Sequence, residues 1–178
     1  MGATEEMTFA PYRQNGWKGW VLDEWQQLPE LADLETWLQA PQQTIVLEAP
    51  CRTVSRRETA LGAVYVKLMR GRNDGAVRNR EVFSWLKWTL LPSRGVYILK
   101  VTAAMVARGH HCPTPVLGAR CRGRWGYPRE LYVSREVTLP TLEECLVRAT
   151  GKGEQQELLA FTAERLARFH LDHFVHGD

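Results

Sequence analysis

Short runs rich in β-branched and aromatic residues, separated by turn residues, predict a set of strands in this chain. The runs between residues 44 and 69 follow one another closely, and they predict an antiparallel meander of three strands. The predicted strands cover residues 16–22, 44–48, 53–58, 62–69, a segment starting near Pro115, and 130–138.

Apolar residues spaced three and four positions apart predict amphipathic helices between and after these strands. The predicted helices cover residues 29–38, 77–91, 93–109, 141–148 and a long final segment. Segment 93–109 has Ser93 as a candidate N-cap and is apolar nearly all round, so we expect it to be buried. In the final helix, the spacing of Leu159, Ala163, Leu166 and His170 places them on one side, and we expect that side to be buried. Strands and helices together predict an α+β fold, preceded by a polar, loosely held lead-in over residues 1–15.

Composition and charge narrow the class of protein. The chain has 178 residues, of which 44% are hydrophobic, a formal net charge of +3 and a pI near 8.8. This mild basic excess suits a nucleotide or another small anion and does not indicate a nucleic-acid partner. We find no membrane-spanning run and no signal-peptide pattern, and the four scattered cysteines indicate free thiols, so we expect a cytoplasmic location.

Two separate segments carry candidate chemistry. Lys67 lies in an apolar strand and shares a face with Tyr65 and Met69, so its ammonium either reaches water or meets an anion in a cleft. The long helix is followed by His176-Gly177-Asp178, which resembles the approach to the catalytic loop of protein-kinase-like phosphotransferases. This resemblance implies that Asp178 is a candidate catalytic base.

The connection between the first two strands of the meander is rich in basic residues. Its candidate phosphate donors are the backbone amides of residues 51–55 with the side chains of Arg52, Thr53 and Ser55. An ordinary hairpin with exposed basic residues is the alternative. The adjacent His110, His111 and Cys112 do not predict a metal site, because consecutive side chains point apart.

The order of these segments resembles the lipopolysaccharide core kinase family, the Kdo and heptose kinases of Gram-negative bacteria. The resemblance covers about residues 16–178. The stretches that carry it are Val64–Lys67, Arg108–Leu117, Leu131–Glu136, and Leu166–His170 leading to His176–Asp178.

The resemblance implies a protein-kinase-like fold that binds ATP and Mg²⁺ and phosphorylates a sugar hydroxyl of the lipopolysaccharide inner core. Residues 1–138 would form the small lobe with an N-terminal extension and hinge, and residues 139–178 the start of a helical large lobe. Lys67 would contact the α/β-phosphates, the backbone of Glu136, Val137 and Thr138 would face the adenine, and Asp178 would act as the base. The implied partners are a nucleotide and the lipopolysaccharide core or a lipid A precursor, with peripheral contact at the inner face of the inner membrane.

The chain departs from the kinase pattern in two places. Segment 93–109, where a kinase carries the acidic partner of its lysine, contains no acidic residue, and Glu81 is the nearest substitute. The metal ligands would lie beyond residue 178, so we expect either a fragment of a longer kinase or a truncated protein without transfer activity. Two alternatives stay open: a catalytically dead kinase-like module that binds a nucleotide or a protein, and a plain α+β domain.

Overall fold

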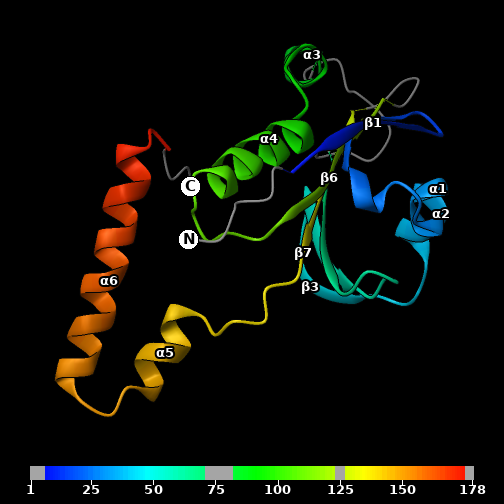
Figure 1. Ribbon diagram of the computed structural model, residues 1–178. Coiled ribbons are helices and arrows are strands. Elements are labelled where there is room, and N and C mark those ends of the chain that lie inside the picture. The colour runs from blue at the N-terminus through cyan, green and yellow to red at the C-terminus, as the bar shows by residue number, and fades with distance from the viewer. Residues whose placement is uncertain (1–6, 71–81, 123–126, 175–178) are drawn as a thin grey trace. The chain divides into compact units, whose positions relative to one another are not determined.

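The computed structural model describes residues 7–70, 82–122 and 127–174 (Figure 1). The chain divides into two compact units, residues 1–136 and residues 137–178. The first unit contains an antiparallel β-sheet with helices packed on it, and the second contains two helices. The predicted α+β class is therefore confirmed.

The sheet has seven strands in the order β1-β2-β6-β7-β5-β4-β3, and every neighbouring pair is antiparallel. The predicted meander is confirmed as β3, β4 and β5, which are consecutive in the sheet. The strands are β1 (Phe9–Gln14), β2 (Trp17–Leu22), β3 (Thr44–Ala49), β4 (Arg52–Arg57), β5 (Val64–Met69), β6 (Pro115–Cys121) and β7 (Arg129–Arg135).

The expectation of a loose lead-in over residues 1–15 is wrong for the residues that form β1. Residues 9–14 pair with β2 along its whole length, from Phe9 opposite Leu22 to Gln14 opposite Trp17. The two-residue turn is Asn15-Gly16, with φ of 45° and 84°. Positive φ at both positions is the geometry of the type I′ hairpin turn, which Asn-Gly favours.

Strand β3 forms one edge of the sheet. Ile45, Val46 and Leu47 are 51%, 55% and 40% exposed. The pairing with β4 is interrupted between Ile45 and Leu47, which leaves Val46 as one extra residue, a β-bulge.

One face of the sheet carries the hydrophobic core of the first unit. Alternate residues of the strands, such as Val64, Val66 and Val133, are almost fully buried there. This face is covered by a 3₁₀ turn (Asp23–Trp25) and the helices α1 (Pro29–Ala32) and α2 (Leu34–Gln39) (Figure 1). The single helix predicted over 29–38 is interrupted at Asp33, whose carboxylate instead accepts the Thr36 amide at 3.3 Å and begins α2.

Helix α4 (Arg94–Ala107) lies on the opposite face, against β6 and β7 (Figure 1). The predicted N-cap is confirmed, since Ser93 accepts the Val96 amide at 3.2 Å. The helix approaches the sheet at two glycines: a Cβ on Gly95 would lie 2.2 Å from the Leu131 carbonyl oxygen, and one on Gly118 would lie 2.5 Å from the Gly95 carbonyl oxygen. Full burial of this helix is not observed, because only Gly95 and Leu99 are buried and Tyr97 is 65% exposed.

A buried carboxylate ties the start of α4 to the sheet. Glu130 of β7 is fully buried, and its Oε2 accepts hydrogen bonds from Ser93 Oγ at 2.6 Å and from the Gly95 amide at 3.2 Å. Its Oε1 accepts Arg120 Nε at 2.6 Å. Arg120 in turn donates to the carbonyls of Leu91 and Pro92, which follow α3 (Val82–Leu90). One ion pair thus holds β6, β7 and the connection between α3 and α4.

The second unit consists of α5 (Leu142–Arg148) and α6 (Lys152–Leu171). The predicted capping box is confirmed, with the Glu144 amide donating to Thr141 Oγ1 at 3.2 Å and the Thr141 amide to Glu144 at 2.7 Å. The buried face predicted for the final helix is not observed. No residue of α6 is buried, and Leu159 and Leu166 are 51% and 46% exposed.

Within residues 7–70, 82–122 and 127–174, no helix combines the length and the apolar character that crossing a membrane demands.

The contact between α4 and the sheet predicts a position-specific glycine effect. Gly95→Ala places a methyl group against the backbone of β7, so we expect it to cost about 1–3 kcal/mol of unfolding free energy. Gly153 is also helical, in α6, and has open space around it. Gly153→Ala should therefore cost nothing and gain about 0.5–1 kcal/mol of helix stability. Urea unfolding of both variants measures the difference, and equal effects would contradict this packing.

Candidate functional site

The candidate site lies around Lys67, in the middle of β5. The strand alternates as predicted: Val64, Val66 and Leu68 are buried in the core, while Tyr65 and Lys67 face the other side and are half-buried. Lys67 stands between Val54 of β4 and Tyr132 of β7 in the sheet. Its ammonium thus leaves the sheet on the face opposite the core, beside the strand on which α4 packs.

Two cations share this face. Burial lowers the pKa of Lys67 below its ordinary value of 10.5, and the positive charge of Arg52 lowers it further. Within the part of the chain that the structure describes, no carboxylate forms an ion pair with Lys67 or with Arg52. A partly desolvated lysine beside an arginine, without a counter-charge, is an arrangement that binds an anion.

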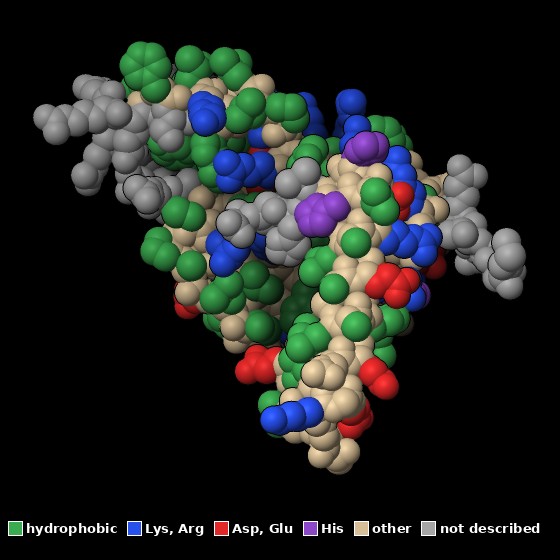
Figure 2. All heavy atoms as spheres, turned by 90° about the vertical axis from the view of Figure 1, so that its left-hand side faces the viewer, with side chains coloured by type: hydrophobic (Ala, Val, Ile, Leu, Met, Phe, Trp, Pro, Cys, Tyr) green, Lys and Arg blue, Asp and Glu red, His purple; other side chains and the backbone are tan. Residues whose placement is uncertain are grey.

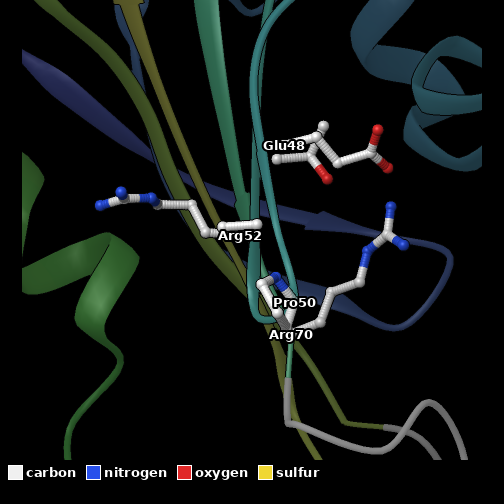
Figure 3. A pocket seen from close by; sticks show the side chains of 6 residues that line it. Glu48, Pro50, Arg52 and Arg70 are labelled. Atoms are coloured by element: carbon white, nitrogen blue, oxygen red, sulfur yellow. The ribbon is translucent and has the colours of Figure 1, made fainter.

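Arg52 lies at the tip of the β3–β4 hairpin, where a polar hollow of about 330 Å³ is lined by Glu48, Ala49, Pro50, Arg52, Thr53 and Arg70. Figure 3 shows the side chain of Arg52 leaving the hairpin on one side and those of Glu48 and Arg70 on the other. Strand alternation gives the same result, since Glu48 is paired with Thr53 and not with Arg52. The acidic residue of the hairpin is therefore turned away from the face of Lys67.

The other donors expected from this connection are not brought to Lys67. Ser55 is opposite Val66 in the sheet and is 4% exposed, so it faces the core. Strand β4 is paired on both sides, which commits the amides of residues 53–55 to the sheet. Of the expected phosphate donors, Arg52 is the one whose side chain shares the face of Lys67.

The neighbouring arginines have structural partners. Arg57 is buried and donates to the carbonyls of Trp37 and Leu38 and to Gln43, so it holds the end of α2 against β4. Arg56 donates from Nε and Nη2 to both carboxylate oxygens of Glu136, at 2.6 and 2.8 Å. This pair holds the pKa of Glu136 below its ordinary value.

The expected hinge begins at this ion pair. The Glu136 amide donates to the Ala63 carbonyl at 2.9 Å, which extends the sheet by one residue. Val137 and Thr138 are exposed, and along the described chain their amides make no backbone hydrogen bond. Two backbone donors thus remain available immediately after an anchored residue.

Two candidate residues cannot be placed. Glu81, the expected acidic partner of Lys67, and Asp178, the expected base, lie outside the described residues. Of the expected residues, the structure brings together Lys67 and Arg52 on one face and Glu136, Val137 and Thr138 at the strand end.

Sequence reasoning missed Tyr132, which is opposite Lys67. Its hydroxyl donates to Thr102 Oγ1 of α4 at 3.4 Å, and burial raises its pKa. The signal was available in the alternation of residues 130–135, because Tyr132 falls on the non-core face between Glu130 and Ser134. Tyr132 therefore connects α4 to the row of cross-strand neighbours that contains Lys67.

Among the described residues, no three His, Cys, Asp or Glu side chains lie close enough together to hold a metal ion. Comparisons with family models, with curated proteins and with solved structures gave no match to this chain.

The lowered pKa of Lys67 predicts a pH-dependent stability effect. Between the folded-state pKa and 10.5 the unfolded chain binds more protons at this position, so stability rises with pH through that window. Lys67→Met removes the cost of burying the charge, and we expect it to raise the melting temperature at neutral pH. The gain should shrink as the pH approaches 10.5. Melting curves of both proteins from neutral to alkaline pH measure it, and a stabilisation that does not change with pH would contradict the assigned cause.

Proposed function

We propose that this chain is the nucleotide-binding small lobe, with the first helices of the large lobe, of an ATP-dependent kinase that phosphorylates a sugar hydroxyl of the lipopolysaccharide inner core. One observation carries the proposal: Lys67 and Arg52 share a sheet face with no carboxylate paired to either among the described residues. Phosphate oxygens would supply the missing negative charge.

The order of the elements supports the same proposal. A strand pair with a tight connection is followed by a strand carrying a lysine, then the helices α3 and α4, then two strands and a linker into a helical unit. Kinases arrange their parts in this order: a connection over the phosphates, a strand-borne lysine, a helix beside it and a hinge at the adenine. A protein-kinase-like fold is thus part of the proposal.

Each residue of the site has a role in this scheme. The Arg52 guanidinium, at the tip of the β3–β4 hairpin, would bind phosphate oxygens. Lys67 would place a single positive charge at the α/β-phosphates. The free amides of Val137 and Thr138 would bond the adenine edge, with Glu136 held in place by Arg56.

Among the described residues there is no magnesium site. In the proposal, Asp178 is the base that accepts the proton of the sugar hydroxyl, and Glu81 is the acidic partner of Lys67.

The absence of acidic residues in α4 favours a second candidate, a nucleotide-binding module without transfer activity. Labelled ATP incubated with lipopolysaccharide distinguishes the two when the protein tested includes the metal ligands expected beyond residue 178. Label transferred to the sugar, and lost in Asp178→Asn, supports the kinase; binding without transfer supports the module.

Lys67→Ala and Arg52→Ala should each weaken ATP binding by about tenfold, because each removes a charged partner of the phosphates. Lys152→Ala, which removes an exposed cation of α6, is the matched control and should leave the affinity unchanged. Adenosine lacks phosphates, so its affinity should be equal in all four proteins. Isothermal titration calorimetry measures both ligands.

Undiminished ATP affinity in both site variants would refute the assignment of this face to phosphate binding. An equal loss with adenosine would indicate a folding defect in the variants, and circular dichroism identifies that case independently.

A further inference from the structure

Helix α3 turns its apolar side outward. Val82, Phe83, Leu86 and Leu90 fall within one arc of the helix, and they are 43%, 87%, 40% and 73% exposed. The two tryptophans of the helix, Trp85 and Trp88, lie on its other side and are half-buried. A surface helix ordinarily buries this apolar arc, and a contiguous exposed patch marks an interaction site.

Positive side chains lie on α3 and next to it. Lys87 is exposed on α3 itself. Arg94 lies over the ring of Trp88, with its guanidinium carbon 4.5 Å from the ring centre, and Arg122 donates to the Thr89 carbonyl at 2.9 Å. Both arginines are exposed. Arg122 is held at the backbone of α3, and Arg94 lies on the side of Trp88, away from the apolar arc. In Figure 2 hydrophobic side chains gather at the top of the molecule, where α3 lies, with Lys and Arg side chains next to them.

The sequence from the first residue of the patch onward is basic, although Glu81 stands directly before Val82. Residues 82–129 hold eight of the 23 Lys and Arg residues of the chain and none of its 20 Asp and Glu residues. The eight are Lys87, Arg94, Lys100, Arg108, Arg120, Arg122, Arg124 and Arg129. Next along the chain, Glu130 is buried and paired with Arg120.

Helix α6 is a useful contrast within the same chain. It also exposes apolar side chains, including Phe161 and Leu171 at 55% and 78%. Acidic residues lie near them in the sequence, Glu157 and Glu164 within that helix and Asp172 at its C-cap. Exposed apolar surface is thus not unique to α3. What distinguishes α3 is that residues 82–129 carry basic and no acidic side chains.

We propose that α3 is a membrane-docking surface that lies on a bilayer of anionic lipids. Phe83 and Leu90 would enter the boundary between headgroups and acyl chains, and Lys87 and Arg122 would pair with lipid phosphates. Long basic side chains can reach the headgroups while their stems stay against the apolar surface. The exposed Tyr97 of α4 adds an aromatic side chain of the kind enriched at membrane interfaces.

A lipid surface fits these observations better than a protein partner does. A bilayer accepts a convex helix with an apolar arc and a cationic rim without a matching groove. The apolar arc and the basic side chains belong to α3 and its neighbours, and the membrane proposal does not rest on the proposed function. Nucleotide binding is measured without lipid, so either proposal can fail alone.

The test is co-sedimentation of the full chain with vesicles. We expect binding to vesicles of phosphatidylglycerol and phosphatidylcholine, weak binding to phosphatidylcholine alone, and a decrease with added salt. Phe83→Ser combined with Leu90→Ser should weaken binding about tenfold, because two inserting side chains are lost. Leu139→Ser combined with Leu171→Ser removes two equally exposed leucines of the second unit and should leave binding unchanged.

A second pair of variants tests the charge. Lys87→Glu should reduce binding to the anionic vesicles more than Lys152→Glu does, although both change the net charge equally. This comparison still decides the question if the double serine variant fails to fold.

Three results would overturn the proposal: no binding to anionic vesicles, equal binding to both vesicle types, or full binding by the Phe83/Leu90 variant while it remains folded. Sedimentation velocity without lipid tests whether a second copy of the chain covers α3 instead of a bilayer. A dimer of the parental chain that dissociates in that variant would show that a second copy covers α3.

Discussion

The position of α4 depends on the buried carboxylate of Glu130. It receives the hydroxyl of Ser93 and the amide of Gly95 at the positive end of the helix, while Arg120 balances its charge. Removing one partner of such a pair leaves the other charge buried and unpaired, which is strongly destabilising. The pair can form because Gly95 and Gly118 let the helix backbone reach the sheet. The ion pair and the two glycines depend on each other, since neither would have this geometry without the other.

The attachment of α4 to the sheet affects the face of the sheet that carries Lys67. Helix α4 is anchored over β6 and β7, and Tyr132 connects it to the row of residues that contains Lys67. The helix therefore borders the lysine instead of covering it, and the side toward β4 stays open to Arg52. Because α4 carries no acidic residue, the helix brings no counter-charge to that face. The positive charge of Lys67 and Arg52 thus has no counter-charge from α4 because of the way in which α4 is held.

Local signals explain which elements could be predicted. The caps at Ser93 and Thr141 and the alternation around Lys67 depend on neighbouring residues, and they were found. Asn15-Gly16 is an equally local signal and was overlooked, and the alternation of β4 already separated Ser55 from Arg52. The burial of Glu130 could not be predicted in the same way, because its partners lie ten and more positions away and meet it through strand register. The break at Asp33 reflects a cap that competes with continuing the helix.

The bulge at Val46 affects how the protein behaves at high concentration. An outer strand with three exposed apolar residues in a row is a template on which another chain can add a strand, and the growth can continue into a fibril. The extra residue breaks the regular spacing of backbone donors and acceptors and increases the local twist. Shortening β3 by that one residue would restore a continuous ladder, and the short length of the strand and the charge of Glu48 would be left to oppose strand addition.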